Sequence, residues 1–345
     1  MCIRDRGKEI KVVIYGVGAL GSRIVRALAK RKEIEFVGAI TRRSNLGKDL
    51  GEVAGLDRKL GVAITNEVDK LLSEVDADIV VHTTSSYLKD VYPQLEKCIK
   101  AGLDVVSTTE ELSYPYRKYP ELSKSLDELA KKHGVAVLGT GINPGFLMDT
   151  LPVVLTAPCE EVKSIEVTRM MYSGNRRIPY QKKIGTGLTK EEFNRMISEG
   201  KITGHVGLYE SIAMIAAALG WDIDDIVELP PEPVICTEEV TTSYTTVKVG
   251  QVAGLKSVAY ATKNGEKIIT LNFISHANVK EPYDEVKIEG TPNLTMRILG
   301  GVHGDIGTVS MVVNSIPKVL KADPGLYTMI DLPVPSYAVR ITGKS

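Results

Sequence analysis

A short apolar run that leads into a glycine-rich turn is the feature that most constrains the fold of this chain. Residues 10–15 (IKVVIY) are apolar and mostly β-branched, which predicts a buried strand. The next six residues, GVGALG, have the spacing G-x-G-x-x-G, and residues 22–32 then place apolar side chains on one helical face. A strand that turns sharply into a helix over glycines predicts the first β-α unit of a parallel sheet.

The same alternation of strand and helix continues through the first 140 residues. Further strands are predicted at residues 35–40, 78–82, 104–107 and 135–138, and helices at residues 67–74, 92–101 and 122–133. Gly102 and Gly134 directly follow two of these helices, which is a usual C-terminal signal. Because parallel strands need helical crossovers, the pattern predicts a doubly wound, Rossmann-type α/β domain over residues 9–150.

The pattern changes near residue 160. One strand (residues 162–171) and two helices (190–199 and 208–219) precede a run of predicted strands at residues 241–252, 257–262, 267–277 and 285–289. Asn264-Gly265 lies between two of them and is a strong hairpin signal. Consecutive strands without intervening helices predict an antiparallel sheet, so residues 151–300 are expected to form a second, α+β domain for substrate binding and dimerisation.

The two ends of the chain are expected to behave differently. A helix is predicted at residues 306–320, followed by a segment at 328–335, and residues 301–345 are expected to return to the Rossmann domain. Residues 1–8 (MCIRDRGK) are charged and aperiodic, and we expect an N-terminal appendage outside the fold.

Charge and cysteine content narrow the class of partner. The chain has 43 basic and 43 acidic residues, so no global field favours nucleic acid or an anionic membrane. No apolar run approaches the roughly 20 residues of a membrane span. The four cysteines and five histidines lack metal-ligand spacing, so no metal is expected. We expect a cytoplasmic protein with reduced cysteines that acts on small molecules.

The glycine turn predicts a dinucleotide site. Gly16 permits the tight turn, Gly18 lets a pyrophosphate approach the backbone, and Gly21 lets helix and sheet pack closely. The N-terminus of the following helix offers free N–H groups and positive potential to phosphates. The expected contacts are Gly16, Val17, Gly18, Ala19, Leu20 and Gly21. The alternative is a glycine-rich turn with no ligand.

The residues after the second strand bear on the choice of nicotinamide cofactor. An acidic residue there would bind a ribose 2′-hydroxyl, but this chain has Thr41, Arg42 and Arg43. Guanidinium groups bind a 2′-phosphate through charge-assisted hydrogen bonds, so NADP(H) is expected to be preferred, with NAD(H) tolerated. Two solvated surface arginines are the alternative.

Polar residues at the other strand ends are further candidates for cofactor binding, because ligands of such sheets bind at the carboxyl ends of the strands. They lie in the segments His82–Ser85, Ser107–Glu111 and Gly139–Gly145. The individual candidates are Thr83, Thr84, Ser85, Thr108, Asn143 and Pro144. Asn143 is equally interpreted as a helix cap.

Four longer strings resemble one family. STTEELSYP (107–115), GTGINPGFLMD (139–149), GHVGLYESIAMIAAALGW (204–221) and GDIGTVSMVVNSIPKVLKADPGLYTMIDLP (304–333) are similar to the 2,4-diaminopentanoate dehydrogenase and native amine dehydrogenase family, within the dihydrodipicolinate reductase-like superfamily. Residues 176–193 keep Gly185-Thr186-Gly187 but lack the paired histidines of the reductase itself. The reductase's site for a cyclic dicarboxylate is therefore expected to be absent.

The resemblance implies reversible oxidative deamination of an amine to a ketone and ammonia with NAD(P). A protonated amine cannot release hydride because its lone pair is occupied, so a base must first remove a proton. The family's catalytic glutamate lies in the string matched here by Thr108-Thr109-Glu110-Glu111. We expect Glu110 to be this base, with Glu111 as the second candidate. The alternative is an acidic pair that merely starts a helix.

The substrate is less constrained. Tyr172, His205 and Tyr209 are expected to contact it, although for His205 a helix-capping role is slightly favoured. A 2,4-diamino acid would need a carboxylate anchor, and an apolar pocket would instead favour simple ketones and alkyl amines. The candidate anchors are Arg169, Arg176, Arg177 and Lys183.

Two other functions stay open. One is a reductase that does not use ammonia, as in dihydrodipicolinate reductase- or homoserine dehydrogenase-like enzymes, and the other is a dinucleotide-binding sensor without turnover. Dependence on ammonia separates the first from an amine dehydrogenase. A homodimer is expected from the resemblance and from the prevalence of twofold pairs.

Overall fold

The computed structural model describes residues 9–338, 340 and 341, and these divide into two units. The first unit combines the described residues of Met1–Phe146 with those of Gly304–Ser345, and the second is Leu147–His303. The sequence-based division placed its boundaries at residues 150 and 300. The appendage expected at residues 1–8 lies outside the described residues.

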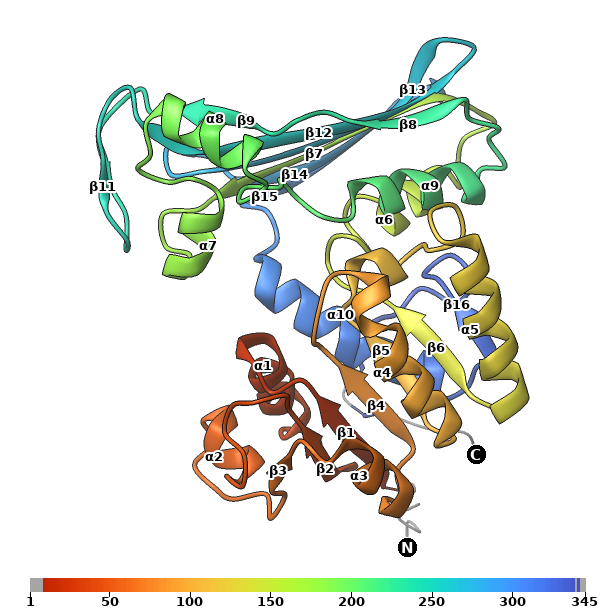
Figure 1. The fold of residues 1–345 in the computed structure, drawn as a ribbon. Helices are drawn as coiled ribbons and strands as arrows, with labels where there is room; N and C mark the ends of the chain where they lie inside the picture. The colour runs from red at the N-terminus through yellow and green to blue at the C-terminus, as the bar shows by residue number, and fades with distance from the viewer. Residues whose placement is uncertain (1–8, 339, 342–345) are drawn as a thin grey trace, which may run out of the picture. The chain divides into compact units, whose positions relative to one another are not determined.

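The first unit contains a parallel sheet in the order β16-β6-β5-β4-β1-β2-β3 (Figure 1). β1 pairs with β2 on one side and with β4 on the other, so the strand order reverses at β1, where sheets of this kind bind ligands. The predicted Rossmann-type sheet is therefore confirmed. Its strands are β1 (Ile10–Tyr15), β2 (Ile34–Ile40), β3 (Ile64–Thr65), β4 (Ile79–His82), β5 (Asp104–Ser107), β6 (Ala136–Gly139) and β16 (Gly325–Tyr327).

Helices cover both faces of this sheet. The last long helix packs on α1 and on β5, whereas α4 and α5 pack on each other and on the opposite face. The helical elements are α1 (Ala19–Leu28), α2 (Leu50–Ala54), α3 (Val68–Glu74), α4 (Leu88–Lys100), the 3-10 turn η1 (Glu110–Leu112), α5 (Pro120–His133) and α10 (Gly304–Val319). α4 begins four residues before the predicted start and includes Pro93.

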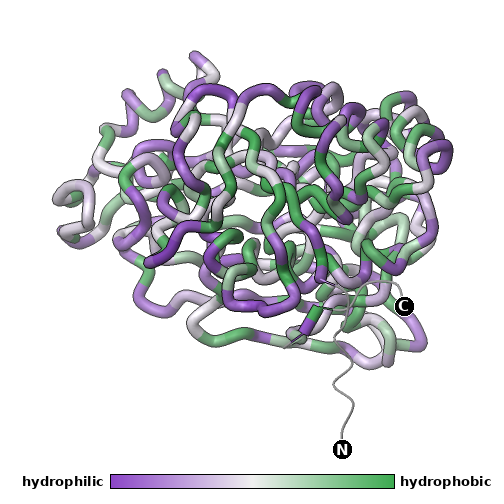
Figure 2. The backbone as a smooth tube through the Cα atoms, turned by 90° about the horizontal axis from the view of Figure 1, so that it is seen from below, coloured by the Kyte–Doolittle hydropathy of each residue, from purple (hydrophilic) through white to green (hydrophobic). Residues whose placement is uncertain are grey.

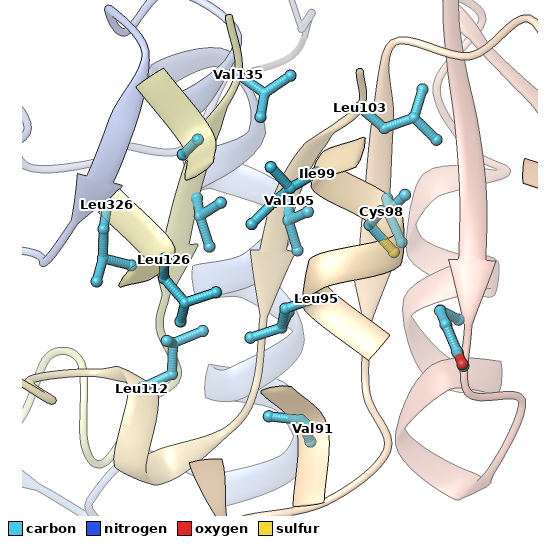
Figure 3. Packing of buried hydrophobic residues seen from close by; sticks show 14 of the residues in the cluster. Val91, Leu95, Cys98, Ile99, Leu103, Val105, Leu112, Leu126, Val135 and Leu326 are labelled. Atoms are coloured by element: carbon cyan, nitrogen blue, oxygen red, sulfur yellow. The ribbon is translucent and has the colours of Figure 1, made fainter. Parts of the chain in front are cut away.

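One cluster of buried side chains fills the space between the sheet and helices α4 and α5 (Figure 3). Leu95, Cys98 and Ile99 recur at helical spacing on α4 and pack with Val105 of β5 and Leu126 of α5. Burial raises the pKa of the Cys98 thiol to about 12, so this cysteine stays protonated.

The other described cysteines, Cys159 and Cys236, are also free thiols. Cys236 is buried, and Cys159 is partly exposed. Cys2 lies outside the described residues.

The second unit is built on a sheet in the order β15-β14-β7-β13-β12-β8, with β9 also paired to β12. Neighbouring strands are antiparallel except β7 and β13, which are parallel, so the sheet is mixed. A parallel pair needs a long connection, and the helices between β7 and β13 supply it. The strands of the sheet are β7 (Glu161–Tyr172), β8 (Asp225–Glu228), β9 (Glu232–Ile235), β12 (Val252–Lys263), β13 (Glu266–His276), β14 (Tyr283–Thr291) and β15 (Leu294–Leu299), and the helices are α6 (Thr150–Leu155), α7 (Ile178–Lys183), α8 (Lys190–Ser198) and α9 (Leu208–Ala218).

The single strand predicted at residues 241–252 is wrong. A separate hairpin of β10 (Val240–Thr241) and β11 (Thr246–Val247) occupies this segment, and β12 starts only at Val252. The Thr242 hydroxyl accepts hydrogen bonds from the backbone N–H groups of Tyr244 and Thr245, which closes the turn without glycine or proline. Threonine and serine stand where a turn usually has glycine or proline, so the sequence pattern did not reveal the turn.

The hairpin predicted at Asn264-Gly265 is present between β12 and β13. Both residues have positive φ, 52° and 78°, as a tight two-residue hairpin turn requires. Figure 2 shows hydrophilic and hydrophobic residues mixed along the chain, and no helix among the described residues is long and apolar enough to cross a membrane.

Candidate active site

The glycine turn between β1 and α1 is closed at two positions and open at the third. Gly16 has φ 111°, and a Cβ there would lie 2.6 Å from the Thr83 carbonyl oxygen. A Cβ at Gly21 would lie 1.9 Å from the Gly16 carbonyl oxygen. At Gly18, in contrast, no atom lies within 4 Å of an added Cβ. Gly16 and Gly21 therefore allow close packing, whereas the space beside Gly18 is open to a ligand.

The start of α1 adds hydrogen-bond donors beside that open space. Gly18 is the N-cap residue, and no side chain caps the helix. The first N–H groups of a helix have no partner within it, so those of Ala19 and Leu20 can bind an anion. Val17 is buried beneath the turn. The turn therefore fits the pyrophosphate of a dinucleotide.

The end of β2 presents two cations. The backbone N–H of Thr41 donates to the Thr65 carbonyl (2.9 Å), which fixes the start of the loop. Arg42 and Arg43 are exposed, and neither guanidinium makes a hydrogen bond or ion pair within the described residues. The two side chains are thus available to a negatively charged ligand.

The loop after β4 is bonded to the glycine turn and to α4. The Thr83 hydroxyl donates to the Gly16 carbonyl (2.8 Å), so this side chain stabilises the turn itself. The hydroxyl of Thr84 donates to Gln94 Oε1 (2.8 Å), and that of Ser85 to Asp90 Oδ2 (3.0 Å). The predicted contacts on β1 and β4 therefore come together at one edge of the sheet.

His82 begins the predicted polar segment His82–Ser85 and lies beneath this loop. Its Nδ1 lies 2.9 Å from Ser107 Oγ and its Nε2 lies 2.9 Å from Gln94 Oε1. The Ser107 hydroxyl in turn donates to Thr109 Oγ1 (3.0 Å), and Gln94 Oε1 also accepts from the Thr84 hydroxyl (2.8 Å). Burial lowers the pKa of His82 to about 4, although the hydrogen bond to Gln94 acts in the opposite direction.

The strand register brings His82 to Ser107. His82 of β4 pairs with Ser107 of β5, so two polar residues face each other at adjacent strand ends. The Tyr15 ring also packs against the imidazole of His82 in a T-shaped arrangement, with the two ring centroids 5.3 Å apart.

The two candidate catalytic glutamates follow β5 and differ in environment. Glu110 starts η1 and is partly exposed, whereas Glu111 is 2% exposed. The Glu111 carboxylate accepts hydrogen bonds from the Leu88 backbone N–H (2.7 Å), the Lys118 ammonium (2.7 Å) and the Tyr119 hydroxyl (2.9 Å). Glu111 is therefore engaged with the protein, and which of the two glutamates acts as the base stays a prediction.

The loop after β6 contains Asn143 and Pro144. Asn143 is 9% exposed, and the neighbouring Ile142 N–H donates to the Thr308 hydroxyl of α10 (3.3 Å). The next helix, α6, begins only at Thr150, where the Asp149 side chain caps it. The helix-cap interpretation of Asn143 is therefore wrong, and its contact with the nicotinamide stays a prediction.

The three predicted substrate residues all lie in the second unit. The imidazole of His205 stacks on the Phe273 ring, with centroids 4.1 Å apart and planes 10° apart. The N-cap of α9 is Gly207, which has no side-chain cap, so the capping role favoured for His205 is wrong. Tyr172 ends β7, and Tyr209 lies in the first turn of α9; both are partly buried.

The candidate carboxylate anchors differ in how the protein holds them. Arg169 is 1% exposed, and its guanidinium pairs with Asp284 (3.1 Å) and donates to the Val302 carbonyl (2.8 Å). Arg176 lies over the Tyr180 ring, 4.6 Å from its centroid. The two remaining candidates, Arg177 and Lys183, are exposed. Among the described residues, no cluster of histidine, cysteine and acidic side chains could hold a metal ion.

Comparisons with known proteins identify the family. A model of the 2,4-diaminopentanoate dehydrogenase C-terminal domain matches residues 146–343, and a model of the dihydrodipicolinate reductase N-terminus matches residues 10–139. A 2,4-diaminopentanoate dehydrogenase from Acetoanaerobium sticklandii is 37% identical over 336 residues, which cover 95% of this chain and 94% of that protein. The chain belongs to the 2,4-diaminopentanoate dehydrogenase family.

Other relatives of the family agree with this assignment. An amine dehydrogenase from Streptomyces virginiae is 22% identical over 351 residues, covering 94% of this chain and 96% of that one. The solved amine dehydrogenase of Mycobacterium smegmatis superposes with a TM-score of 0.83 at 28% identity, covering 96% of this chain and 98% of that one. The predicted family, fold and class of NAD(P)-dependent oxidoreductase are therefore confirmed.

Proposed function

We propose that this member of the family catalyses the reversible oxidative deamination of an amine to a ketone and ammonia, with NADP(H) as the preferred cofactor. One observation supports the assignment most directly. At the end of β5, Glu111 is engaged by three donors while the adjacent Glu110 stays partly exposed, two strands from the glycine turn. A carboxylate at the mouth of the sheet is the group that an amine substrate requires.

The residues that would hold the cofactor follow from the geometry. The open space at Gly18 and the uncapped start of α1 would bind the pyrophosphate, and Arg42 and Arg43 would bind the 2′-phosphate. The bound nicotinamide accepts a hydride in deamination and donates one in the reverse direction.

Glu110 would exchange the protons of the reaction. An ammonium substrate, NADP⁺ and water give the ketone, ammonium, NADPH and one proton. The Glu110 carboxylate first takes a proton from the substrate ammonium, so that the nitrogen lone pair can expel the hydride and form an iminium ion. Water then adds to the iminium carbon, and the protonated carboxyl returns its proton to the departing nitrogen of the carbinolamine.

Dependence on ammonium tests the reaction class. NADPH oxidation is measured with a ketone, with and without ammonium, and we expect turnover only when ammonium is present. Equal rates without ammonium would show a reductase of another chemistry. Binding of NADPH without turnover on any amine or ketone would instead favour a sensor.

Cofactor preference has a separate test. Arg42→Asp and Arg43→Asp are expected to raise the KM for NADPH by about 10-fold or more, because each variant loses a charge-assisted hydrogen bond to the 2′-phosphate. The KM for NADH, which has no 2′-phosphate, should change little. Arg195→Asp, on an exposed position of α8, is the matched control. Unchanged discrimination between the two cofactors in both variants would contradict the preference.

We propose a 2,4-diaminopentanoate-like amino acid as the substrate, because the relative that is 37% identical is a 2,4-diaminopentanoate dehydrogenase. Steady-state rates with 2,4-diaminopentanoate are compared with those for cyclohexanone plus ammonia. A higher kcat/KM for the simple ketone would contradict the proposal. The carboxylate anchor stays a prediction among Arg169, Arg176, Arg177 and Lys183.

A homodimer and a cytoplasmic location also stay proposals. Met170, Tyr283 and Ile274 form one register row across β14, β7 and β13, and all three are partly exposed. A twofold partner would cover such a row. Sedimentation velocity at several protein concentrations tests this, and a monomer at all of them would contradict it.

A further inference from the structure

The loops after β4 and β5 are joined by hydrogen bonds on both sides of Glu110. On one side, the Thr109 hydroxyl donates to the Ser85 carbonyl (2.9 Å). On the other side, the Glu111 backbone N–H donates to the Ser86 carbonyl (3.1 Å). The turn of residues 109–113, called here the Glu110 turn, is thereby held beside the start of α4.

The buried Glu111 side chain also links the Glu110 turn to α4. Its carboxylate reaches the Leu88 N–H at the first residue of α4, whose own N-cap residue, Tyr87, provides no side-chain cap. A negative charge at this position also interacts favourably with the helix dipole. Glu111 therefore acts as the cap of a helix that begins 23 residues earlier in the chain.

Two further groups hold the same carboxylate. Lys118 and Tyr119, which follow the turn, both donate to Oε1, while Leu88 donates to Oε2. Each oxygen is thus fixed from a different segment. A buried carboxylate with several donors is costly to move, because movement would leave charged and polar groups without partners.

We propose that Glu111 is a positioning residue: it holds the Glu110 turn against α4 and so sets the orientation in which Glu110 exchanges a proton with the substrate. This inference rests on the proposed role of Glu110. Both carboxylate oxygens of Glu111 are occupied by donors of the protein, so its effect on the reaction is transmitted through the turn.

A double-mutant cycle tests the proposal. Glu111→Gln keeps the shape of the side chain but removes its charge, and it is expected to lower kcat about 10- to 100-fold, as misplacement of a catalytic group does. In the Glu110→Gln background the same change should alter kcat less than about twofold, because no proton-exchanging carboxylate is left to misplace. Losses that multiply would show general damage and overturn the proposal.

The pH profile gives a second readout. Removal of the negative charge beside Glu110 favours the ionised form of Glu110, so the acid limb of kcat/KM should move to lower pH in Glu111→Gln. A variant that had only lost stability would keep the limb in place. An unmoved limb together with a lowered kcat would therefore overturn the proposal.

Graded and matched variants keep the test clear if Glu111→Gln folds poorly. Tyr119→Phe removes one of the three donors but keeps the charge of Glu111, so it is expected to lower kcat less and to leave the acid limb in place. Glu121→Gln, exposed in the first turn of α5, should change neither kcat nor the acid limb.

NADPH titration confirms that every rate refers to saturated enzyme. Wild-type kcat in both Tyr119→Phe and Glu111→Gln would overturn the role of Glu111, whereas wild-type turnover in Glu110→Gln would instead overturn the proposed function.

Discussion

At the scale of single residues, His82 shows how one neutral side chain can join three segments. It ends β4, and its two ring nitrogens lie 2.9 Å from Ser107 Oγ of β5 and 2.9 Å from Gln94 Oε1 of α4. Burial disfavours the charged ring, so the imidazole stays neutral at this position.

The low pKa of His82 predicts a specific pH dependence of stability. Between pH 6.5 and about 4 the unfolded chain takes up a proton at this residue and the folded chain does not, so the free energy of unfolding falls as the pH drops through this window. The total effect is about 3 kcal/mol. Urea unfolding across the window should give a flatter pH dependence for His82→Gln than for the wild type. Equal slopes for the two proteins would contradict the assignment.

The adjacent glutamates Glu110 and Glu111 show what cannot be inferred from sequence alone. Glu110 and Glu111 could be assigned to a catalytic string by resemblance, but nothing local separates their roles. The partners that distinguish them are Leu88, far earlier in the chain, and two residues beyond the turn. Those contacts exist only after the sheet has formed.

At the scale of elements, the glycines of the six-residue turn have two different roles. Gly16 and Gly21 allow close packing, whereas Gly18 faces open space in which a ligand can bind. Gly18→Ala places a methyl group in open space, so the thermal stability should be unchanged while the Kd for NADPH rises about 10-fold or more. Gly21→Ala places a methyl group 1.9 Å from the Gly16 carbonyl oxygen and should lower the stability itself. Thermal unfolding and fluorescence titration of both variants check the contrast. Equal loss of stability in the two variants would contradict it.

Long elements with regular periodicity were predictable, and short ones were not. The strands and helices of the first unit follow the apolar pattern, as does α10. β3 and β16 have two and three residues, too few for any period to be visible. The hairpin β10–β11 was missed because the side chain of Thr242 closes its turn in place of glycine.

At the scale of the whole molecule, the dinucleotide-binding unit is assembled from two distant parts of the sequence. β16 pairs with β6 at the edge of the sheet, and Leu326 of β16 is held by Asp127 and by the Tyr116 hydroxyl. The sequence predicted a returning C-terminal segment but not the strand that it adds. Neither the register of β16 nor its partners can be read from three residues.

Truncation after residue 320 should therefore damage the first unit. The edge of β6 loses its partner strand, and Leu326, which is 5% exposed, no longer covers the core. We expect a lower yield of soluble protein and weakened NADPH binding, measured by titration against the full chain. A truncated chain that binds NADPH with unchanged Kd would contradict this expectation.

The divided unit also has a consequence for synthesis on the ribosome. α10 and β16 leave the exit tunnel only after every residue of the second unit has been made. Until then the nascent chain has an uncovered face beside β5 and an unpaired edge at β6, the kind of surface that holding chaperones bind and that nascent chains use to aggregate. Translation speed through residues 147–303 thus sets how long each new molecule stays in that state.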